Sequence, residues 1–470
     1  MKSRKRFACL MLASAMITAF FAGTAFAQFP RFEVVVSPTA SENPVTGRVI
    51  LLISKSDQTE PRLQFSMYGP VIAGIDIDQL PPDESIFFNE GVLSYPIKLS
   101  ELPYGDYFVQ AVINVYQQVH RADGKKIWVH MNDGTIEFFT AAAGNLYSDV
   151  YPVHIGGGGT IRIKAEHVIP KSPRPEDTKW LKHVKVQSQK LTKFWGHPIF
   201  IHATVLLPRG YEDNPETFYP SIYTLGHSET PFRFSTVPPK NEDENKGVNP
   251  NTGLESGYAT YQKWISDDFP RVIVITLQQQ TPYFADSYSV NSANNGPYGD
   301  AVIEEVIPYL EGQFRIIREP YARHVEGAST SGWQTLALIL HNPDFFGGAW
   351  VLQPDPVDFR SYVSVNIYED ENAFEIPLRE LLTIERYFRR TTWGQPILTV
   401  RQLSLFEAVL GTHGRSFGQL GAWEAVYGPV GHDGYPVQLW DYLTGEINRD
   451  VANYMRDNGY DLRVYAEKNW

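Results

Sequence analysis

The sequence predicts a three-layer α/β domain preceded by an all-β, sandwich-like domain. From about residue 183 onward, strand patterns alternate with helical patterns, as in α/β domains. Before residue 150, short β-branched and aromatic runs alternate with turn residues, as in antiparallel sandwiches. We therefore divide the chain into a signal segment at 1–27, a sandwich-like domain at 28–150, a linker at 151–182, an α/β core at 183–360, and a helical or loop-rich extension at 361–470.

The first 27 residues are typical of a secretion signal. A basic start precedes an apolar run at 7–21, and Ala25 and Ala27 place small residues where signal peptidase cleaves. The apolar run covers about 15 residues, fewer than the ~20 that a membrane-spanning helix needs. We expect a secreted or periplasmic protein with no stable membrane anchor.

Charge and cysteine content exclude several classes of function. The chain carries 41 basic and 53 acidic side chains, and four of the basic residues lie in the signal segment. Such an acidic chain is a poor partner for nucleic acid or an anionic membrane. The only cysteine, Cys9, also lies in the signal, so we expect no disulfide and no thiolate nucleophile. No metal-ligand or nucleotide-binding pattern is present, and we expect neither a metal nor a cofactor.

The sandwich-like region contains no set of catalytic side chains. Its expected strands lie at 32–36, 49–53, 63–67 and 108–115. The glycine run at 156–159 precedes an expected strand at 160–164 rather than a helix, so it indicates a loop and not a phosphate site. We expect this region to pack against the domain that follows, or to position it.

The α/β core has strand patterns at 202–207, 221–225 and 272–277. The last of these is an uninterrupted apolar run, which is typical of a strand buried on both faces of a parallel sheet. Apolar residues at helical spacing predict a helix over 301–314, with Asp300 as its N-cap. Aromatic residues after the 272–277 strand either stack on sugar or phenolic rings or pack in the core: Tyr283, Phe284, Tyr288 and Tyr298.

Residues 324–340 read as a short strand, a tight turn and an apolar helix, with Ser329 at the turn. This is the pattern of a nucleophile elbow, which presents a serine hydroxyl beside the N-terminus of the following helix. Only small side chains fit two residues before and after the nucleophile, and Gly327 and Ser331 stand there. Ser329 is therefore the candidate nucleophile; the alternative is that it only caps the helix.

Motifs at 206–211, 218–227, 305–315 and 341–347 flank this segment in a fixed order. Together they resemble the putative-esterase (esterase D-like) family of the α/β-hydrolase fold, over roughly residues 183–360. The resemblance implies an acyl-enzyme on Ser329. It also implies an oxyanion site made by the backbone N–H of Thr330 and by the loop at Gly226 and His227. Two such donors, fixed in advance, stabilise the oxyanion that forms when serine attacks an ester.

The acid and the base of a triad are harder to place. In this fold a carboxylate and then a histidine follow the serine. His341 lies about three turns along the elbow helix, and neither His413 nor His432 follows an expected buried strand. The simplest expectation is that the sequence is truncated at its C-terminus and that both groups lie beyond it.

A rearranged triad is the alternative. It would use His432 or His413 as the base, and Asp355 or Asp358 as the carboxylate, because both aspartates follow an expected strand at 348–352.

The first functional hypothesis is an exported serine hydrolase that cleaves a small-molecule or carbohydrate-linked carboxylic ester. The second is a catalytically inactive or truncated protein of the same fold with a binding role. A third is a lectin-like protein that depends on the N-terminal domain alone.

Overall fold

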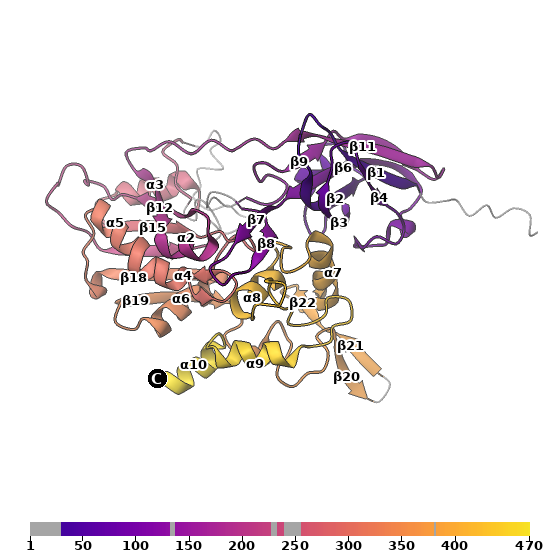
Figure 1. Cartoon of the computed structure of the whole chain (residues 1–470). Coiled ribbons are helices and arrows are strands. Elements are labelled where there is room, and N and C mark those ends of the chain that lie inside the picture. Colours follow the sequence, from indigo (N-terminus) through magenta and orange to yellow (C-terminus); the bar gives the residue numbers. More distant parts are fainter. Residues whose placement is uncertain (1–29, 132–136, 227–232, 239–254, 380–381) are drawn as a thin grey trace, which may run out of the picture.

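The computed structural model describes residues 30–131, 137–226, 233–238, 255–379 and 382–470. The expected signal segment lies outside these residues. An N-terminal β-sheet and an α/β domain lie side by side, and the C-terminal segment packs against both (Figure 1). Within the described ranges, every helix is too short or too polar to cross a bilayer.

The N-terminal sheet has nine strands in the order β4-β1-β11-β9-β6-β2-β3-β5, with β10 paired to β6. All its pairs are antiparallel except β1 with β11. A separate hairpin, β7 (Gln117–His120) and β8 (Lys126–Val129), points toward the α/β domain (Figure 1). The nine strands are β1 (Arg31–Val36), β2 (Val45–Ser54), β3 (Val71–Leu80), β4 (Ser85–Phe88), β5 (Ser94–Tyr95), β6 (Gly105–Val115), β9 (Leu146–Ser148), β10 (Tyr151–Ile155) and β11 (Thr160–Val168).

Two expectations for this region were wrong. The linker expected at 151–182 is shorter, because β10 and β11 occupy its first part and β12 begins at Leu181, which leaves residues 169–180 as the connection between the two sheets. The strand expected at 63–67 is absent from the described structure, and a short 3-10 helix, Pro61–Gln64, stands there. Pro61 has no N–H for a strand ladder and a φ fixed near the helical value, so it starts a helical turn instead.

Both faces of the N-terminal sheet are buried. Val49, Leu51 and Val109 belong to a core that the strands enclose. Ile50 and Leu52 point to the opposite face and pack against a C-terminal helix. Because successive residues of a strand face opposite sides, burial of both sides requires the continuous apolar run of β2.

That C-terminal helix is α7 (Val400–Leu410), and its last turn is fixed to the N-terminal sheet. The buried Arg48 guanidinium donates to the carbonyls of Val409 (2.8 Å) and Ala408 (3.0 Å) and pairs with Asp76 at 3.0 Å. A cation is favourable at this end of a helix, where carbonyls lack partners. A Cβ on Gly74 would lie 2.0 Å from the Val409 carbonyl oxygen, so only glycine permits this approach.

The α/β domain contains a six-stranded sheet in the order β12-β13-β15-β14-β18-β19. The pairs β12–β13 and β13–β15 are antiparallel, and the remaining pairs are parallel. The last strand, β19, is an edge within the described structure, and Trp350 and Leu352 on it are more than half exposed. The strands are β12 (Leu181–Ser188), β13 (Ile199–Leu206), β14 (Ser221–Leu225), β15 (Ile273–Gln278), β18 (Arg323–Ser329) and β19 (Gly348–Pro354).

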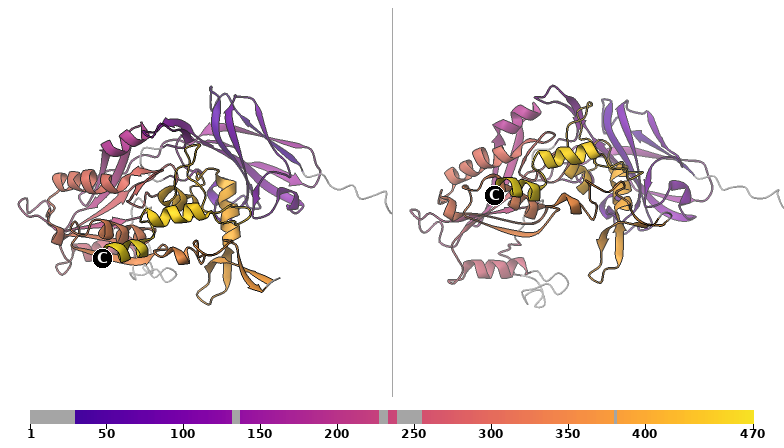
Figure 2. Two further views of the ribbon diagram at one scale, coloured as in Figure 1. Left: turned by 60° about the horizontal axis from the view of Figure 1, so that its bottom comes forward. Right: turned by 90° about the horizontal axis from the view of Figure 1, so that it is seen from below.

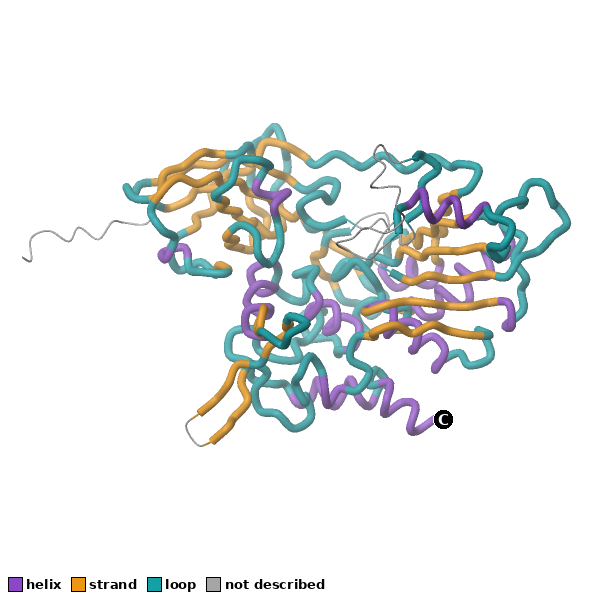
Figure 3. The backbone as a smooth tube through the Cα atoms, turned by 180° about the vertical axis from the view of Figure 1, so that it is seen from behind, coloured by secondary structure: helices purple, strands orange, loops and turns teal. Residues whose placement is uncertain are grey.

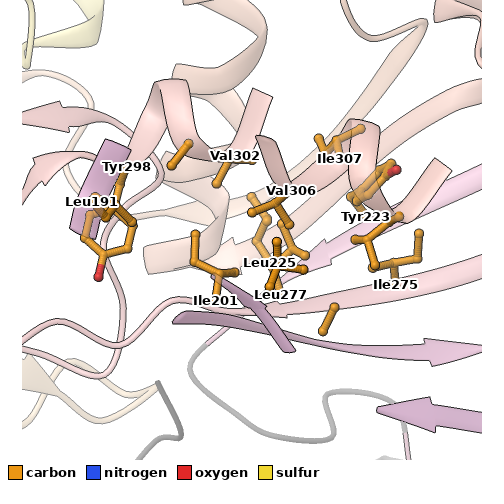
Figure 4. Close-up of a cluster of buried hydrophobic side chains, with 14 of the residues drawn as sticks. Leu191, Ile201, Tyr223, Leu225, Ile275, Leu277, Tyr298, Val302, Val306 and Ile307 are labelled. Atoms are coloured by element: carbon orange, nitrogen blue, oxygen red, sulfur yellow. The ribbon is translucent and has the colours of Figure 1, made fainter. Parts of the chain in front are cut away.

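Helices cover both faces of this sheet. On one face, α2 (Gln189–Trp195) and the helical segment 298–313 pack on the strands through alternate apolar residues (Figure 4). On the other face, Trp264 of α3 (Gly257–Ile265) packs against Leu206 and Val272. The three-layer arrangement that the sequence predicts is therefore present.

The helix expected at 301–314 begins earlier and is irregular. It runs through α4 (Tyr298–Asp300), a π-helical stretch Ala301–Val306 and α5 (Ile307–Gln313). Asp300 lies inside the helix and is not its N-cap. Its carboxylate instead accepts a hydrogen bond from the Asn291 amide at 2.8 Å.

The C-terminal segment contains two β-hairpins that the sequence did not indicate: β20 (Glu375–Arg379) with β21 (Leu382–Glu385), and β22 (Tyr387–Arg390) with β23 (Pro396–Thr399). Its remaining helices are α8 (Gln419–Tyr427), α9 (Arg449–Asp457) and α10 (Leu462–Asn469). The hairpin β20–β21 projects from the body of the molecule, and α9 and α10 run beneath the α/β domain (Figures 2 and 3).

We expect Arg48→Met to lower the free energy of unfolding by about 3 kcal/mol, because Asp76 and two carbonyls would lose their buried donor. Chemical denaturation of the purified protein measures this. Arg456→Met is the control, since Arg456 is more than a third exposed and its ion pair is with the exposed Asp457. Its loss should be below about 1 kcal/mol. Equal effects of both substitutions would contradict the role given to Arg48.

Candidate active site

The ends of four neighbouring strands gather the candidate residues. Ser329 ends β18, Asp355 follows β19, Gly226 follows β14, and the segment 279–290 follows β15. Because these strands are parallel to one another, their carboxyl ends lie at one edge of the sheet. Crevices at this edge are the usual place for ligands in open α/β sheets.

Ser329 lies in a sharp turn between β18 and α6 (Thr330–His341). Its φ of 59° and ψ of −123° are sparsely populated for a side-chain-bearing residue and cost roughly 1–3 kcal/mol. A Cβ on Gly327 would lie 2.3 Å from the carbonyl oxygen of Ser331, so strand and helix almost touch. The side chain of Ser329 remains exposed at the tip of this turn.

The Ser329 hydroxyl contacts a carboxylate directly. Its Oγ donates to Oδ1 of Asp355 at 3.2 Å. The backbone N–H of Asp355 in turn donates to the Ser329 carbonyl oxygen at 3.0 Å, so both residues are fixed to one another. The sequence predicted Asp355 as the carboxylate that orients a histidine base, whereas in the structure Asp355 contacts the serine hydroxyl itself.

The second oxygen of Asp355 is held by several donors. The Tyr288 hydroxyl donates to Oδ2 at 2.7 Å, the Thr330 hydroxyl at 3.1 Å and the Trp423 indole N–H at 3.3 Å. Burial, and then the Asp355 charge, raise the pKa of Tyr288 well above its ordinary value. The phenol therefore keeps its proton and remains a donor. Together these contacts fix the orientation of the carboxylate.

Two of the residues around Asp355 come from α8, whose start is held by a buried acid. The Glu407 carboxylate accepts the N–H groups of Leu420 (2.8 Å) and Gly421 (2.9 Å). It thereby caps the helix on which Gln419 and Trp423 lie. The Gln419 amide is 3.4 Å from Oδ2 of Asp355 and also donates to the Tyr288 hydroxyl. Sequence reasoning missed this contribution from the C-terminal segment.

The histidines that follow Ser329 lie elsewhere. His413 pairs with Asp433 at 3.0 Å, and the ring of His341 packs on Tyr465. The backbone carbonyl of His432 accepts the Lys125 ammonium at 2.9 Å.

Among the described residues, none of these three rings contacts Ser329 or Asp355, so the rearranged triad with His432 or His413 is not assembled. Asp358 caps a short 3-10 helix and pairs with Arg360 and Arg463. It does not contact Ser329.

Of the expected oxyanion site, Thr330 and Gly226 lie within the described residues. Thr330 opens α6, and the N–H groups of a first helical turn have no acceptor within the helix. Gly226 lies beside the elbow, since a Cβ on it would be 3.8 Å from the Ser331 hydroxyl oxygen. His227 lies outside the described residues.

The segment after β15 is buried, which favours the packing interpretation of its aromatic residues. Tyr283, Phe284, Tyr288 and Tyr298 are all in the core. Tyr288 nevertheless has a polar role through its hydroxyl, and its φ of 61° is in the left-handed region. Its N–H donates to the Asp286 carboxylate at 2.8 Å, which stabilises this turn.

Asp286 is fully buried below the elbow helix. One carboxylate oxygen accepts from Tyr288 and from the Gln334 amide of α6. Burial raises the pKa of Asp286 to about 8. The side chain is therefore a neutral acid at pH 7 and does not add a second charge beside Asp355.

One family model matches part of this chain. The sequence model of the family described as "Putative esterase" matches residues 200–408. A search of curated proteins finds no match. Among solved structures, a ferulic acid esterase is similar at 18% identity and TM-score 0.26 over 38% of this chain and 60% of its own length.

Two further structures are similar to the same extent. An S-formylglutathione hydrolase from Agrobacterium tumefaciens matches at 15% identity and TM-score 0.25, covering 39% of this chain and 62% of that one. A fluorophosphonate-binding serine hydrolase from Staphylococcus aureus matches at 16% identity and TM-score 0.27, covering 39% and 60%. The matched part thus spans about three-fifths of each of these proteins.

We expect Gly327→Ala to destabilise the elbow by about 1–3 kcal/mol, because the added methyl would overlap the Ser331 carbonyl. Gly157→Ala is the matched control, since a Cβ there meets nothing within 4 Å. Chemical denaturation measures both changes. A Gly327→Ala protein as stable as Gly157→Ala would show that strand and helix are not in close contact.

Replacing Asp286 tests its neutral state. The folded protein keeps the Asp286 proton until the pH reaches about 8, whereas the unfolded chain loses it near its pKa of 3.8. The free energy of unfolding of wild type is therefore highest below pH 3.8 and falls as the pH rises from 3.8 to about 8. Asp286→Asn cannot titrate and keeps the acceptor oxygen. Wild type should therefore lose up to about 1.4 kcal/mol per pH unit relative to Asp286→Asn between these two values. Parallel denaturation curves across the range would contradict a buried, protonated Asp286.

Proposed function

We propose that this chain, whose residues 200–408 match the esterase family, cleaves carboxylic esters with Ser329 as nucleophile and Asp355 as general base. One observation carries the proposal. The Ser329 hydroxyl stands exposed on a strained elbow and donates to a carboxylate that other side chains hold in place. A serine needs a base within hydrogen-bond reach to become a nucleophile, and in the described part of the chain Asp355 is the base that accepts a hydrogen bond from Ser329.

The reaction follows from this geometry. Ser329 Oγ attacks the ester carbonyl carbon while its proton passes to Asp355 Oδ1. The carbonyl oxygen becomes an oxyanion, which the Thr330 N–H at the positive end of α6 stabilises. The bond to the alcohol then breaks, and the alcohol leaves with the proton from Asp355. Water attacks the acyl-enzyme by the same steps and releases the acid and free serine.

A carboxylate is a weaker base than an imidazole, so its position has to compensate. Tyr288, Thr330 and Trp423 all engage Oδ2, which leaves Oδ1 directed at Ser329. An acceptor already held in place avoids the cost of reorganisation during the reaction. We expect the enzyme to favour esters with good leaving groups, because such esters place the smallest demand on the base.

The substrate class and location are part of the proposal. The similar structures are named as a ferulic acid esterase and an S-formylglutathione hydrolase, which supports a small-molecule or carbohydrate-linked ester as substrate. The basic and apolar start of the sequence supports export to a secreted or periplasmic location.

A second candidate is a non-catalytic binding protein of the same fold. The observation in its favour is that His341, His413 and His432 all lie away from Ser329, so a histidine-dependent triad is not formed by them. Fold alone does not decide between an enzyme and a binding protein.

Labelling with a fluorophosphonate probe decides between the two. We expect wild type to be labelled and Ser329→Ala not to be labelled. Asp355→Asn should slow labelling by about 100-fold or more, because loss of a general base typically costs this much. Ser266→Ala, at the exposed serine that caps the C-terminal end of α3, serves as the control and should label like wild type.

Two outcomes would overturn parts of this proposal. Rapid labelling of Asp355→Asn would mean that another group acts as the base. A folded wild-type protein that is not labelled, and does not hydrolyse p-nitrophenyl acetate, would support the binding role instead.

A further inference from the structure

A cavity of about 610 Å³ lies where the N-terminal region, the connection 169–180 and the α/β sheet meet. Its wall comes from the segment 137–141, from residues 171–177 of the connection, and from β12, β13 and β15. Neither Ser329 nor Asp355 is among the described residues of this wall, so the cavity is treated as a site of its own. Cavities of this size commonly hold a small-molecule ligand.

The floor of the cavity is polar, although a β-sheet forms it. Side chains of β12, β13 and β15 stand opposite one another in two cross-strand rows. In one row Lys185 is opposite His202, which is opposite Gln278, and in the next His183 is opposite Thr204. The Gln278 amide donates to the Thr204 hydroxyl at 3.2 Å, which links the two rows. The rows therefore place several hydrogen-bonding groups within reach of one ligand.

The same face of the sheet is apolar two residues further along these strands. Leu181 is opposite Leu206, which is opposite Val274, and Trp264 of α3 packs on this row. The change from apolar to polar side chains thus coincides with the change of cover from a helix to the cavity. Polar side chains are costly under an apolar cover and favourable where a polar ligand or water reaches them.

Cations predominate among the charged side chains of the described wall. Lys185 comes from β12, and Lys171 and Arg174 come from the connection. The Lys185 ammonium lies 3.9 Å from the centroid of the Phe200 ring. All three cations also make further contacts within the protein, which restrict their positions. Their attraction for an anion depends on their charge and not on a lack of partners.

The two acids of the described wall are engaged with neighbouring groups. The Asp177 carboxylate accepts the backbone N–H of His183 at 2.8 Å and lies 3.2 Å from Nδ1 of its ring. The Glu137 carboxylate accepts the N–H of Ala143 at 3.1 Å. The cavity is therefore locally cationic on a chain whose overall charge is negative.

We propose that this cavity binds an anionic saccharide, an oligomer of a uronic acid. The ligand carboxylate pairs with the three cations, because Lys and Arg donate strong, charge-assisted hydrogen bonds to carboxylates. The sugar hydroxyls bind the polar floor, which consists of His202, Thr204 and Gln278. Phe138 is about half exposed and lies in the wall with Pro173 and Pro175, so these residues supply an apolar surface for the C–H face of a sugar ring. The inference does not rest on hydrolysis at Ser329.

Isothermal titration calorimetry of the purified protein tests the inference, with α-1,4-digalacturonate as the probe. Galactobiose is the neutral probe of similar size, and citrate is an anion without sugar rings. We expect digalacturonate to bind at least about tenfold more tightly than either. Equal binding of galactobiose would contradict recognition of the charge, and equal binding of citrate would contradict recognition of the saccharide.

Replacing a single cation tests the position of the ligand. Lys185→Met removes the ammonium and keeps most of the alkyl chain, so digalacturonate binding should weaken about tenfold or more. Lys182→Met is the matched control, because Lys182 lies on the same strand, faces the other side of the sheet and removes the same charge. Arg174→Gln, at an exposed position of the connection, is a second test that leaves the sheet unchanged and should also weaken binding.

Two results would overturn the site. The first is a folded wild type that does not bind digalacturonate. The second is equal affinity of Lys185→Met and Lys182→Met for digalacturonate, with Arg174→Gln also unchanged. Wild type and Ser329→Ala should bind the probe alike. A protein that lacks esterase activity but binds digalacturonate through Lys185 would therefore support the cavity and contradict only the proposed hydrolysis.

Discussion

The near contact of β18 with α6 is the constraint on which the site depends. Because Gly327 has no Cβ, the strand can pass within van der Waals distance of the Ser331 carbonyl and turn at once into the helix. Ser329 must then adopt a strained backbone conformation, which directs its hydroxyl away from both elements. The strain is maintained by packing of the helix below, where Trp333 lies fully buried among aromatic residues of the C-terminal segment.

Local patterns predicted the parts of the fold whose signal is local. The alternating and continuous apolar runs identified β1, β2, β6, β13, β14 and β15, and the elbow was recognisable from small residues around Ser329. A strand was expected at 160–164, but the linker boundary failed because β10 and β11 pair with strands far earlier in the chain, and nothing in the segment itself shows which sheet it joins. Pro61 disfavours a strand, but the alternating apolar residues at 63–67 led to the prediction of one.

The sequence likewise predicted only part of the candidate site. Ser329 and Thr330 follow from one short motif, whereas Asp355 was one of two candidate aspartates, with Asp358, after an expected strand. What selects Asp355 is its position directly after β19, whose last residue Pro354 pairs with Ser329, together with donors from Tyr288 and Trp423. Those donors are separated from it by more than sixty residues on either side, so no spacing rule connects them. Only the folded sheet brings them to one edge.

The position of α7 has a consequence for how the protein is made. The face of the N-terminal sheet that carries Ile50, Leu52 and Val112 is covered by Phe406, Val409 and Leu410, which are synthesised long after the sheet is complete. Until they arrive, a newly made N-terminal domain presents a flat apolar surface to its surroundings, and such surfaces promote aggregation. An N-terminal domain made without α7 is therefore expected to aggregate more readily than the whole chain.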